Sequence, residues 1–278
     1  MKTVFWSDKT LAANNKSPLI FTHIAKTAGT SVFKSIGFNF KVRAIGSKIS
    51  RLLLTDRYKN MVELIRSGER VDCIPGYVQM HMPFGLHRIF RMDNIKYIVF
   101  IREPVARTIS ALQHCIWLTP HKQSYVKEYY DNANDVYEFL EKCIENETNC
   151  NVMTKQLSGM EDFDDIVFTE QEAVEGEIYS PRHKNKRKYR EEEMRVFLEN
   201  AKKNLKNCYD FVGFQETFSR DIKKLCKRYN LSLKRWQKHN ITNINQISAK
   251  DERVRELISQ MNLFDLQLYE YAWKRSVQ

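Results

Sequence analysis

Residues 18–31, PLIFTHIAKTAGTS, decide the fold. The segment 18–24 (PLIFTHI) is a short apolar run with bulky side chains, which is typical of a buried strand. After a loop of small residues, the segment 30–36 predicts the first turns of a helix, and Gly37 ends it. Strand, tight loop and helix in this order predict the opening of an α/β unit.

The run KYIVFI at residues 96–101 is the strongest strand signal in the chain. It is continuous and apolar, as expected for a strand in the middle of a parallel sheet. The sequence Arg102-Glu103-Pro104 ends the strand, and Pro104 suits the first turn of a following helix. We predict further strands at 77–80 and 209–214 and helices at 48–67, 122–158, 191–206, 216–229 and 251–273.

The order of these elements predicts the fold class. Strands and helices alternate without an internal repeat or an interdomain linker. This pattern favours an α/β fold, a three-layer α/β/α, P-loop-like domain that is helix-rich and has a central, mostly parallel sheet. We expect residues 1–278 to form a single domain.

Composition limits the class of protein. Of the 278 residues, 42% are hydrophobic and 28% charged, an ordinary globular balance. The 45 Lys and Arg exceed the 34 Asp and Glu by 11, so anionic ligands such as nucleic acid, acidic glycan or a phosphorylated cofactor are attracted. Residues 1–23 contain no continuous apolar h-region, and the sequence has no run of 18 or more apolar residues, so neither a signal peptide nor a membrane span is expected. We therefore expect no membrane insertion and a cytoplasmic location, or a lumenal one if the chain is truncated.

The six cysteines include no CxxC pair and no Cys/His set at zinc spacing, so we predict no metal site. Cys143 and Cys150 are close enough in sequence to close a small loop in an oxidising compartment. Buried free thiols are the alternative for all six cysteines.

The loop after the first strand predicts an anion cradle. A strand that turns into a helix at small residues leaves backbone N–H groups pointing outward, next to the helix N-terminal partial charge. The positive charge, the side-chain hydroxyls and the close backbone approach come from Lys26, Thr27, Ala28, Gly29, Thr30 and Ser31. An ordinary capped helix start would contain the same residue types, so this alternative stays open.

The cradle differs from a Walker A loop, in which Lys follows the second Gly, because here Lys26 precedes Gly29. Ligands of open α/β sheets bind at the carboxyl ends of strands, so Arg102 is expected to face the same crevice as Lys26. Ser110 lies about two helical turns beyond Arg102. Kinases often place a metal-binding Asp at such a strand end, whereas Arg102 indicates phosphate binding without a metal. Alternatively, Arg102 pairs with Glu103 or another carboxylate.

Residues 23–31 (HIAKTAGTS) and 102–110 (REPVARTIS) together resemble the two motifs that bind 3′-phosphoadenosine-5′-phosphosulfate (PAPS) in carbohydrate sulfotransferases. The nearest branch is the uronyl and heparan sulfate 2-O-sulfotransferase-like group with its microbial relatives. Three weaker segments agree in order, at residues 79–85, 151–159 and 211–214.

The resemblance implies roles for the cradle residues. The Lys26–Ser31 loop would hold the 5′-phosphosulfate, with Lys26 near the bridging oxygen, while Arg102 and Ser110 would hold the 3′-phosphate. Sulfuryl transfer needs in-line positioning and stabilisation of charge on the leaving group, and Lys26 suits the second task.

The acceptor hydroxyl also needs a general base. His81 matches the catalytic histidine segment of the family, and a histidine titrates in a suitable range. His87 is the second candidate, and Glu103 is a weaker one that we expect to fix Arg102 or Arg107. His23 is expected to pack at the strand end.

These expectations describe a sulfotransferase that moves the sulfuryl group from PAPS to a glycan or other hydroxyl-bearing acceptor. The basic residues 182–190 could grip an anionic acceptor, or could form a solvated loop. A Mg²⁺-dependent small-molecule kinase and a non-catalytic polyanion-binding protein are the alternatives. No nucleic acid is expected as a partner, since the chain has no recognition-helix or RNP-like pattern.

Overall fold

The computed structural model describes residues 5–7, 18–39, 42–43, 77–80, 83–89, 94–117, 125–159, 188–234 and 247–276. Three features predicted from the sequence lie outside these residues: the helix at 48–67, the proposed base His81, and residues 182–187 of the basic stretch.

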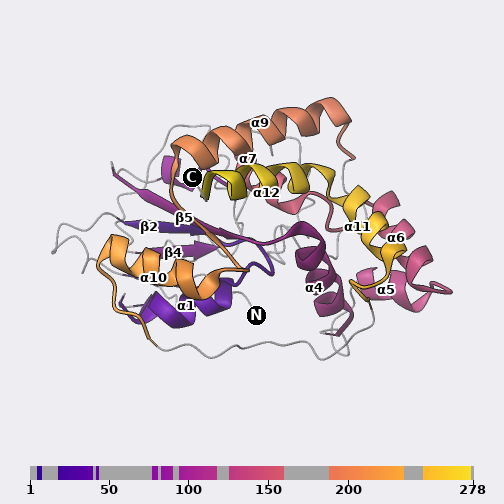
Figure 1. The fold of residues 1–278 in the computed structure, drawn as a ribbon, viewed down its shortest axis with the longest axis horizontal. Helices are drawn as coiled ribbons and strands as arrows, with labels where there is room; N and C mark the ends of the chain where they lie inside the picture. Colours follow the sequence, from indigo (N-terminus) through magenta and orange to yellow (C-terminus); the bar gives the residue numbers. More distant parts are fainter. Residues whose placement is uncertain are drawn as a thin grey trace.

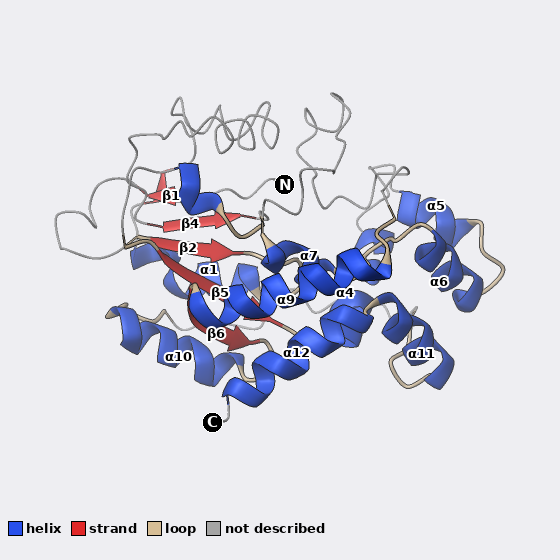
Figure 2. Cartoon of the chain, turned by 90° about the horizontal axis from the view of Figure 1, so that it is seen from above, coloured by secondary structure: helices blue, strands red, loops and turns tan. Residues whose placement is uncertain are grey.

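Within the described ranges, six strands form one sheet in the order β3-β1-β4-β2-β5-β6 (Figure 2). Four of them run parallel to one another: β4 (Tyr77–Met80), β2 (Leu19–Thr22), β5 (Lys96–Ile101) and β6 (Tyr209–Phe214). The remaining two, β1 (Phe5–Ser7) and β3 (Val42–Arg43), add an antiparallel edge. Strands of three and two residues are too short to show a period in the sequence. The prediction of a mostly parallel sheet is confirmed.

The side chains of β5 alternate between two buried layers. Tyr97, Val99 and Ile101 belong to the core on one face of the sheet, and Ile98 and Phe100 belong to the core on the other. Successive side chains of a strand point to opposite faces. Because both faces are covered, the strand appears in the sequence as an unbroken apolar run.

Helices cover both faces of the sheet, which makes the three layers visible in Figure 1. One face is covered by α1 (Gly29–Ile36) and α10 (Phe218–Tyr229). The other face is covered by α7 (Val152–Ser158), α9 (Glu191–Asn207) and α12 (Leu263–Ser276). The predicted three-layer α/β/α fold is therefore confirmed.

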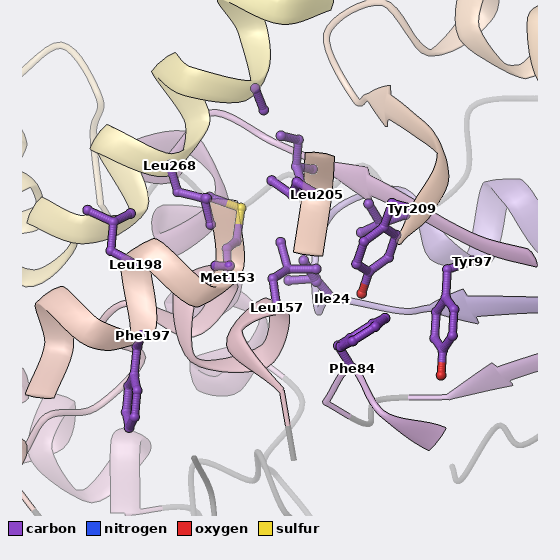
Figure 3. Packing of buried hydrophobic residues seen from close by; sticks show 14 of the residues in the cluster. Ile24, Phe84, Tyr97, Met153, Leu157, Phe197, Leu198, Leu205, Tyr209 and Leu268 are labelled. Atoms are coloured by element: carbon purple, nitrogen blue, oxygen red, sulfur yellow. The ribbon is translucent and has the colours of Figure 1, made fainter. Parts of the chain in front are cut away.

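The layer of α7, α9 and α12 contains the largest apolar cluster of the described residues (Figure 3). Met153 and Leu157 of α7 pack with Leu198 of α9 and Leu268 of α12 against the sheet. Ile24, which follows β2, belongs to the same cluster and is fully buried. The chain is thus anchored in this core just before the cradle loop begins.

A helical lobe extends beyond the carboxyl ends of the strands, at the right in Figure 1. It consists of α4 (Pro104–Trp117), α5 (Tyr125–Asp131), α6 (Val136–Glu145) and α11 (Glu252–Met261). Leu112, Phe139 and Ile258 lie at the centre of its apolar core. Because α4 starts directly after β5, the lobe lies beside the edge where ligands of such sheets bind.

The predicted helix at 122–158 is three helices. Asp135 starts α6 by accepting hydrogen bonds from the backbone N–H groups of Tyr137 and Glu138, each at 2.9 Å. Glu147, Asn149 and Asn151 have positive φ angles of 48°, 61° and 48°, which end the helical path before α7. The predicted helix at 251–273 is likewise divided into α11 and α12.

Two 3₁₀ turns complete the described chain, η2 (Gly37–Asn39) and η3 (Leu86–Ile89). The five cysteines that the structure describes are free thiols, so Cys143 and Cys150 do not form a disulfide. Cys143, Cys150 and Cys226 are buried, as the alternative expected, whereas Cys115 and Cys208 are only half-buried. In the described part of the chain, no helix has both the length and the apolar character needed to cross a bilayer.

Candidate functional site

The backbone between β2 and α1 is bent by two residues in the left-handed region. Lys26 has φ 69° and Ala28 has φ 73°, and neither is glycine. Such residues cost about 1–3 kcal/mol each and persist only where the surroundings fix them. Ala28 is the N-cap of α1, and its side chain provides no capping hydrogen bond. The N–H groups at the start of α1 are therefore not capped by a side chain, as an anion cradle requires.

Thr27 fixes this loop from inside. Its side chain is fully buried, and its hydroxyl donates to the backbone carbonyl of Ile24 at 2.9 Å. The expectation that the Thr27 hydroxyl donates to a ligand is therefore wrong, since the hydroxyl is engaged within the loop. Thr30 is exposed and Ser31 is half-buried, so their hydroxyls are the ones on the accessible side of the helix start.

His23 explains the glycine at the start of α1. A Cβ atom added at Gly29 would lie 1.8 Å from Nε2 of His23. The imidazole stacks on Phe21, with ring centroids 5.6 Å apart, which confirms that His23 packs at the strand end. Gln79 of β4 donates from Nε2 to the carbonyl of Gly29 at 3.2 Å, and this nitrogen also lies 3.3 Å from Nδ1 of His23. The cradle is thus braced by the neighbouring strand.

Arg102 joins the two predicted motifs. Its guanidinium donates from Nη1 to the backbone carbonyl of Lys26 at 3.2 Å. The contact follows from topology, because β2 and β5 are adjacent parallel strands that end at the same edge. The Nε of Arg102 is buried and has no hydrogen-bond partner among the residues that the structure describes. The structure therefore brings Lys26 and Arg102 together, with a donor of Arg102 unused.

The electrostatics of the site are dominated by these two cations. Burial lowers the pKa of Lys26, and the neighbouring positive charge of Arg102 lowers it further. Burial also lowers the pKa of Arg102, while the carboxylates of Glu216 and Glu103 oppose this effect. A bound anion would stabilise the charged form of both side chains. The arrangement is chemically suited to a phosphate or sulfate group.

The helix that follows β5, α4, contributes two further polar side chains to the site. Ser110 and His114 are four residues apart on α4 and therefore lie on the same side of the helix. Burial lowers the pKa of His114 to about 4, and the charge of Lys26 lowers it as well. His114 is thus neutral at pH 7, and it lies close enough to Lys26 for the lysine charge to affect its pKa. Sequence reasoning missed this residue, although its spacing from Ser110 was a usable signal.

Glu103 acts on Arg102 through its charge, as one of the two expectations held, and it has a further role at the start of α4. Its carboxylate accepts hydrogen bonds from the N–H groups of Val105 at 3.0 Å and Ala106 at 2.7 Å, so it caps α4. The guanidinium of Arg107 is fully buried and donates instead to the backbone carbonyl of Asn149 at 3.0 Å. Glu103 therefore anchors the helix that carries Ser110, and does not pair with Arg107.

The histidines proposed as bases differ in position. His81 lies outside the described residues; it follows Met80, the last residue of β4, whose Cα partner in the sheet is Thr22. His87 lies in η3, where its N–H donates to the hydroxyl of Tyr97 at 2.8 Å. Tyr97 is five residues before Arg102, or about 16 Å along a strand. His87 is therefore at the other end of β5 from the cradle.

The basic stretch is described only from residue 188 onward, and Arg190 lies at the start of α9, 3.4 Å from Glu193. Among the described residues, no three His, Cys, Asp or Glu side chains are grouped so that they could hold a metal ion. No protein-family model matches the chain, and no curated protein matches it.

Proposed function

We propose that this chain is a PAPS-dependent sulfotransferase acting on a hydroxyl of a carbohydrate-type acceptor. The observation that carries the proposal is the hydrogen bond between Arg102 and the carbonyl of Lys26. It joins a left-handed loop at the end of β2 to a half-buried arginine at the end of β5 whose Nε is buried. Two linked anion-binding groups at one sheet edge suit a ligand that carries two separate anionic groups.

The residues at this edge fit the two ends of PAPS. The N–H groups at the start of α1, with Thr30 and Ser31, would hold the 5′-phosphosulfate. Arg102 would donate its unused Nε–H to the 3′-phosphate, and Ser110 would add a hydroxyl. When bound, PAPS supplies the sulfuryl group that is transferred.

The remaining tasks fall to two side chains of this chain. Lys26 would stabilise the negative charge that develops on the leaving phosphate, an effect worth roughly 3–4 kcal/mol by analogy with oxyanion donors. His81 would take the proton from the acceptor hydroxyl. Its sequence position, directly after β4, supports this role because β4 and β2 end at the same edge.

The alternative functions are less well supported. In a Mg²⁺-dependent kinase of the P-loop type, Lys would follow the second Gly of the loop, whereas Lys26 precedes Gly29. A protein that only binds polyanions through surface charge would not need a strained loop braced by Gln79 and Arg102.

Ligand binding provides the first test. We expect 3′-phosphoadenosine-5′-phosphate to raise the melting temperature in the presence of EDTA. At a hundred times its dissociation constant a ligand adds about 2.7 kcal/mol of stability. Arg102→Gln should abolish the shift, whereas Arg228→Gln, an exposed arginine of α10, should retain it. No shift with this nucleotide, together with stabilisation by ATP only when Mg²⁺ is present, would support the kinase instead.

Transfer of label from PAPS to a glycan and lipid panel provides the second test. Lys26→Ala should reduce turnover by roughly 10²–10³-fold, as for loss of an oxyanion donor. Lys34→Ala, which changes an exposed lysine of α1, the helix that follows the cradle loop, is the matched control. His81→Ala should also abolish turnover while nucleotide binding persists. Retained turnover in His81→Ala would contradict the assignment of the base, and His114→Ala would then be the next variant.

A further inference from the structure

The two helical layers of the protein differ in charge. In α9 and α12, which cover one face of the sheet, six carboxylates balance six cations. The described residues of the other layer, 29–39 and 218–234, carry seven cations and a single carboxylate. We call these cations the basic face; they are Lys34, Arg220, Lys223, Lys224, Lys227, Arg228 and Lys234.

The single carboxylate of this layer, Asp221, neutralises only one cation of the basic face. Asp221 is buried and accepts hydrogen bonds from the N–H of Phe214 at 3.0 Å and from the hydroxyl of Thr217 at 2.6 Å. It also pairs with Arg220 at 2.8 Å. Apart from this one pair, its carboxylate is directed inward, toward the end of β6 and the start of α10.

The cations of the basic face are all exposed. Arg228 lies 3.8 Å from Asp210, but the five lysines form no ion pair with any residue that the structure describes. In α9, by contrast, Arg195 pairs with Glu191 and Lys202 pairs with Glu199. A mixed, paired surface is the ordinary solvated case, whereas a surface of one sign attracts an anionic partner.

The basic face is broad and held rigidly. The helices α1 and α10 lie side by side against the sheet (Figure 1), and their apolar sides are buried in one cluster. The segment after α10 crosses to α1, where Lys234 donates its N–H to the carbonyl of Ser35 at 3.0 Å. Asn39 fixes the same segment by donating to the carbonyl of Ser232 at 2.7 Å. The charges thus spread over two helices and a connecting segment.

We propose that the basic face docks the protein on an anionic phospholipid bilayer. Five of the seven cations lie on α10, and Lys34 of α1 and Lys234 extend the charge to the two neighbouring elements. A flat anionic surface can contact all three elements at once. Leu233, which is 38% exposed beside Lys234, offers an apolar side chain to the interfacial region of a bilayer. The apolar side of α10 is buried against the sheet, so the helix itself does not insert. Docking is peripheral and electrostatic, and it does not depend on the proposed function.

Cosedimentation of the full chain with vesicles tests this proposal. We expect binding to vesicles of phosphatidylcholine with phosphatidylglycerol, and none to phosphatidylcholine alone. Binding should weaken steeply as NaCl is raised, because salt screens exposed charges. Each lysine near such a surface contributes roughly fivefold, so K223Q/K224Q/K227Q should lower the partition coefficient on the order of a hundredfold.

The matched control removes the same net charge from the opposite layer. R195Q/K203Q/K206Q changes three exposed cations of α9 and should bind vesicles nearly as the wild type does. Leu233→Ala should weaken vesicle binding without changing binding to soluble heparin. Equal losses in the two triple variants would overturn the proposal, since net charge alone would then explain binding. Wild-type binding to heparin but not to anionic vesicles would also overturn it, in favour of a linear polyanion.

Discussion

Gly29 and the imidazole of His23 compete for the same space at the start of α1. Because a Cβ at position 29 would lie 1.8 Å from Nε2 of His23, Gly29→Ala must displace the ring or the loop. We expect Gly29→Ala to lower the free energy of unfolding by about 1–3 kcal/mol, the usual cost of overpacking. Urea unfolding followed by circular dichroism measures this loss.

The double variant identifies the cause of that loss. His23→Ala removes the ring that the new Cβ meets, so the cost of Gly29→Ala should be smaller in the His23→Ala background. We expect a coupling energy of at least about 1 kcal/mol in the double-mutant cycle. Strictly additive losses would mean that another part of the cradle, and not His23, excludes a side chain at position 29.

His114 makes the stability depend on pH. Burial and Lys26 lower its pKa to about 4 in the folded protein, below the ordinary histidine value of 6.5. The unfolded chain therefore binds a proton at this site before the folded chain does, so stability falls as the pH drops from about 6.5 toward 4.

Replacing His114 with Gln isolates this contribution. Between pH 7 and pH 5 the wild type should lose about 1 kcal/mol more unfolding free energy than His114→Gln, after allowance for solvent screening. Urea unfolding at the two pH values gives both numbers. An identical loss in the two proteins would show that His114 titrates normally in the folded state.

At the scale of elements, the N-termini of α7 and α12 cap each other. The side chain of Asn151 accepts from the N–H groups of Phe264 at 3.0 Å and Asp265 at 3.3 Å. In return, the carboxylate of Asp265 accepts from the N–H groups of Met153 at 3.0 Å and Thr154 at 2.7 Å. This exchange holds together two helices that are more than a hundred residues apart in sequence.

Asp265 has a second task beside this cap. Arg107 is fully buried, its Nε and Nη1 have no hydrogen-bond partner among the described residues, and the charge of Asp265 opposes the lowering of its pKa by burial. Asp265→Ala would leave this cation without its compensating charge, so we expect a loss of about 3–5 kcal/mol in the free energy of unfolding. Thermal and urea unfolding measure it.

Asp251→Ala is the matched control for this prediction. Asp251 is also an N-cap aspartate, since its carboxylate accepts from the N–H of Val254 at 3.0 Å, but it is half-buried and lies near no buried arginine. Its loss should cost about 1 kcal/mol. Equal losses in the two variants would show that capping alone, and not the charge of Arg107, sets the importance of Asp265.

Elements whose signal is local were predictable from the sequence. The strands at 96–101 and 209–214 have the predicted bounds. In the first, burial on both faces leaves an unbroken apolar run. The second is the last strand of the described sheet and contains Asp210, and its bulky apolar residues were the signal. The breaks between α5, α6 and α7 were not predicted, since apolar residues continue at helical spacing through them. The break between α6 and α7 depends on left-handed residues such as Glu147, which is not a usual helix breaker. The break between α5 and α6 lies just before Asp135, the N-cap of α6.

In the candidate site, too, some features could be predicted from the sequence and others could not. The meeting of Lys26 and Arg102 was predictable because adjacent parallel strands end at one edge. The bracing by Gln79 and the packing of His23 on Gly29 depend on side-chain contacts between strands, which the sequence does not record. The expected effect of the Glu103 charge on Arg102 is present, but the cap that Glu103 forms on α4 was not predicted from the sequence.

At the scale of the whole molecule, α4 connects the sheet to the helical lobe. It begins at the end of β5, and Ile109 and Leu112 on its apolar side pack into the core of the lobe. On another side of α4, Arg107 reaches Asn149 in the turn before α7, which belongs to the sheet layer. Because one helix carries both sets of contacts, we expect the lobe and the sheet to unfold as one cooperative unit.

Ile258→Ala tests this cooperativity. Ile258 is fully buried at the centre of the lobe, and the cavity left by the smaller side chain should cost about 2–5 kcal/mol. If the molecule is one unit, hydrogen exchange should accelerate by the same factor in β5 as in α6, because both open only in global unfolding. Val196→Ala, at a side chain that is 56% exposed, should change neither rate. Acceleration confined to α6 would instead show that the lobe opens on its own while the sheet and its cradle stay folded.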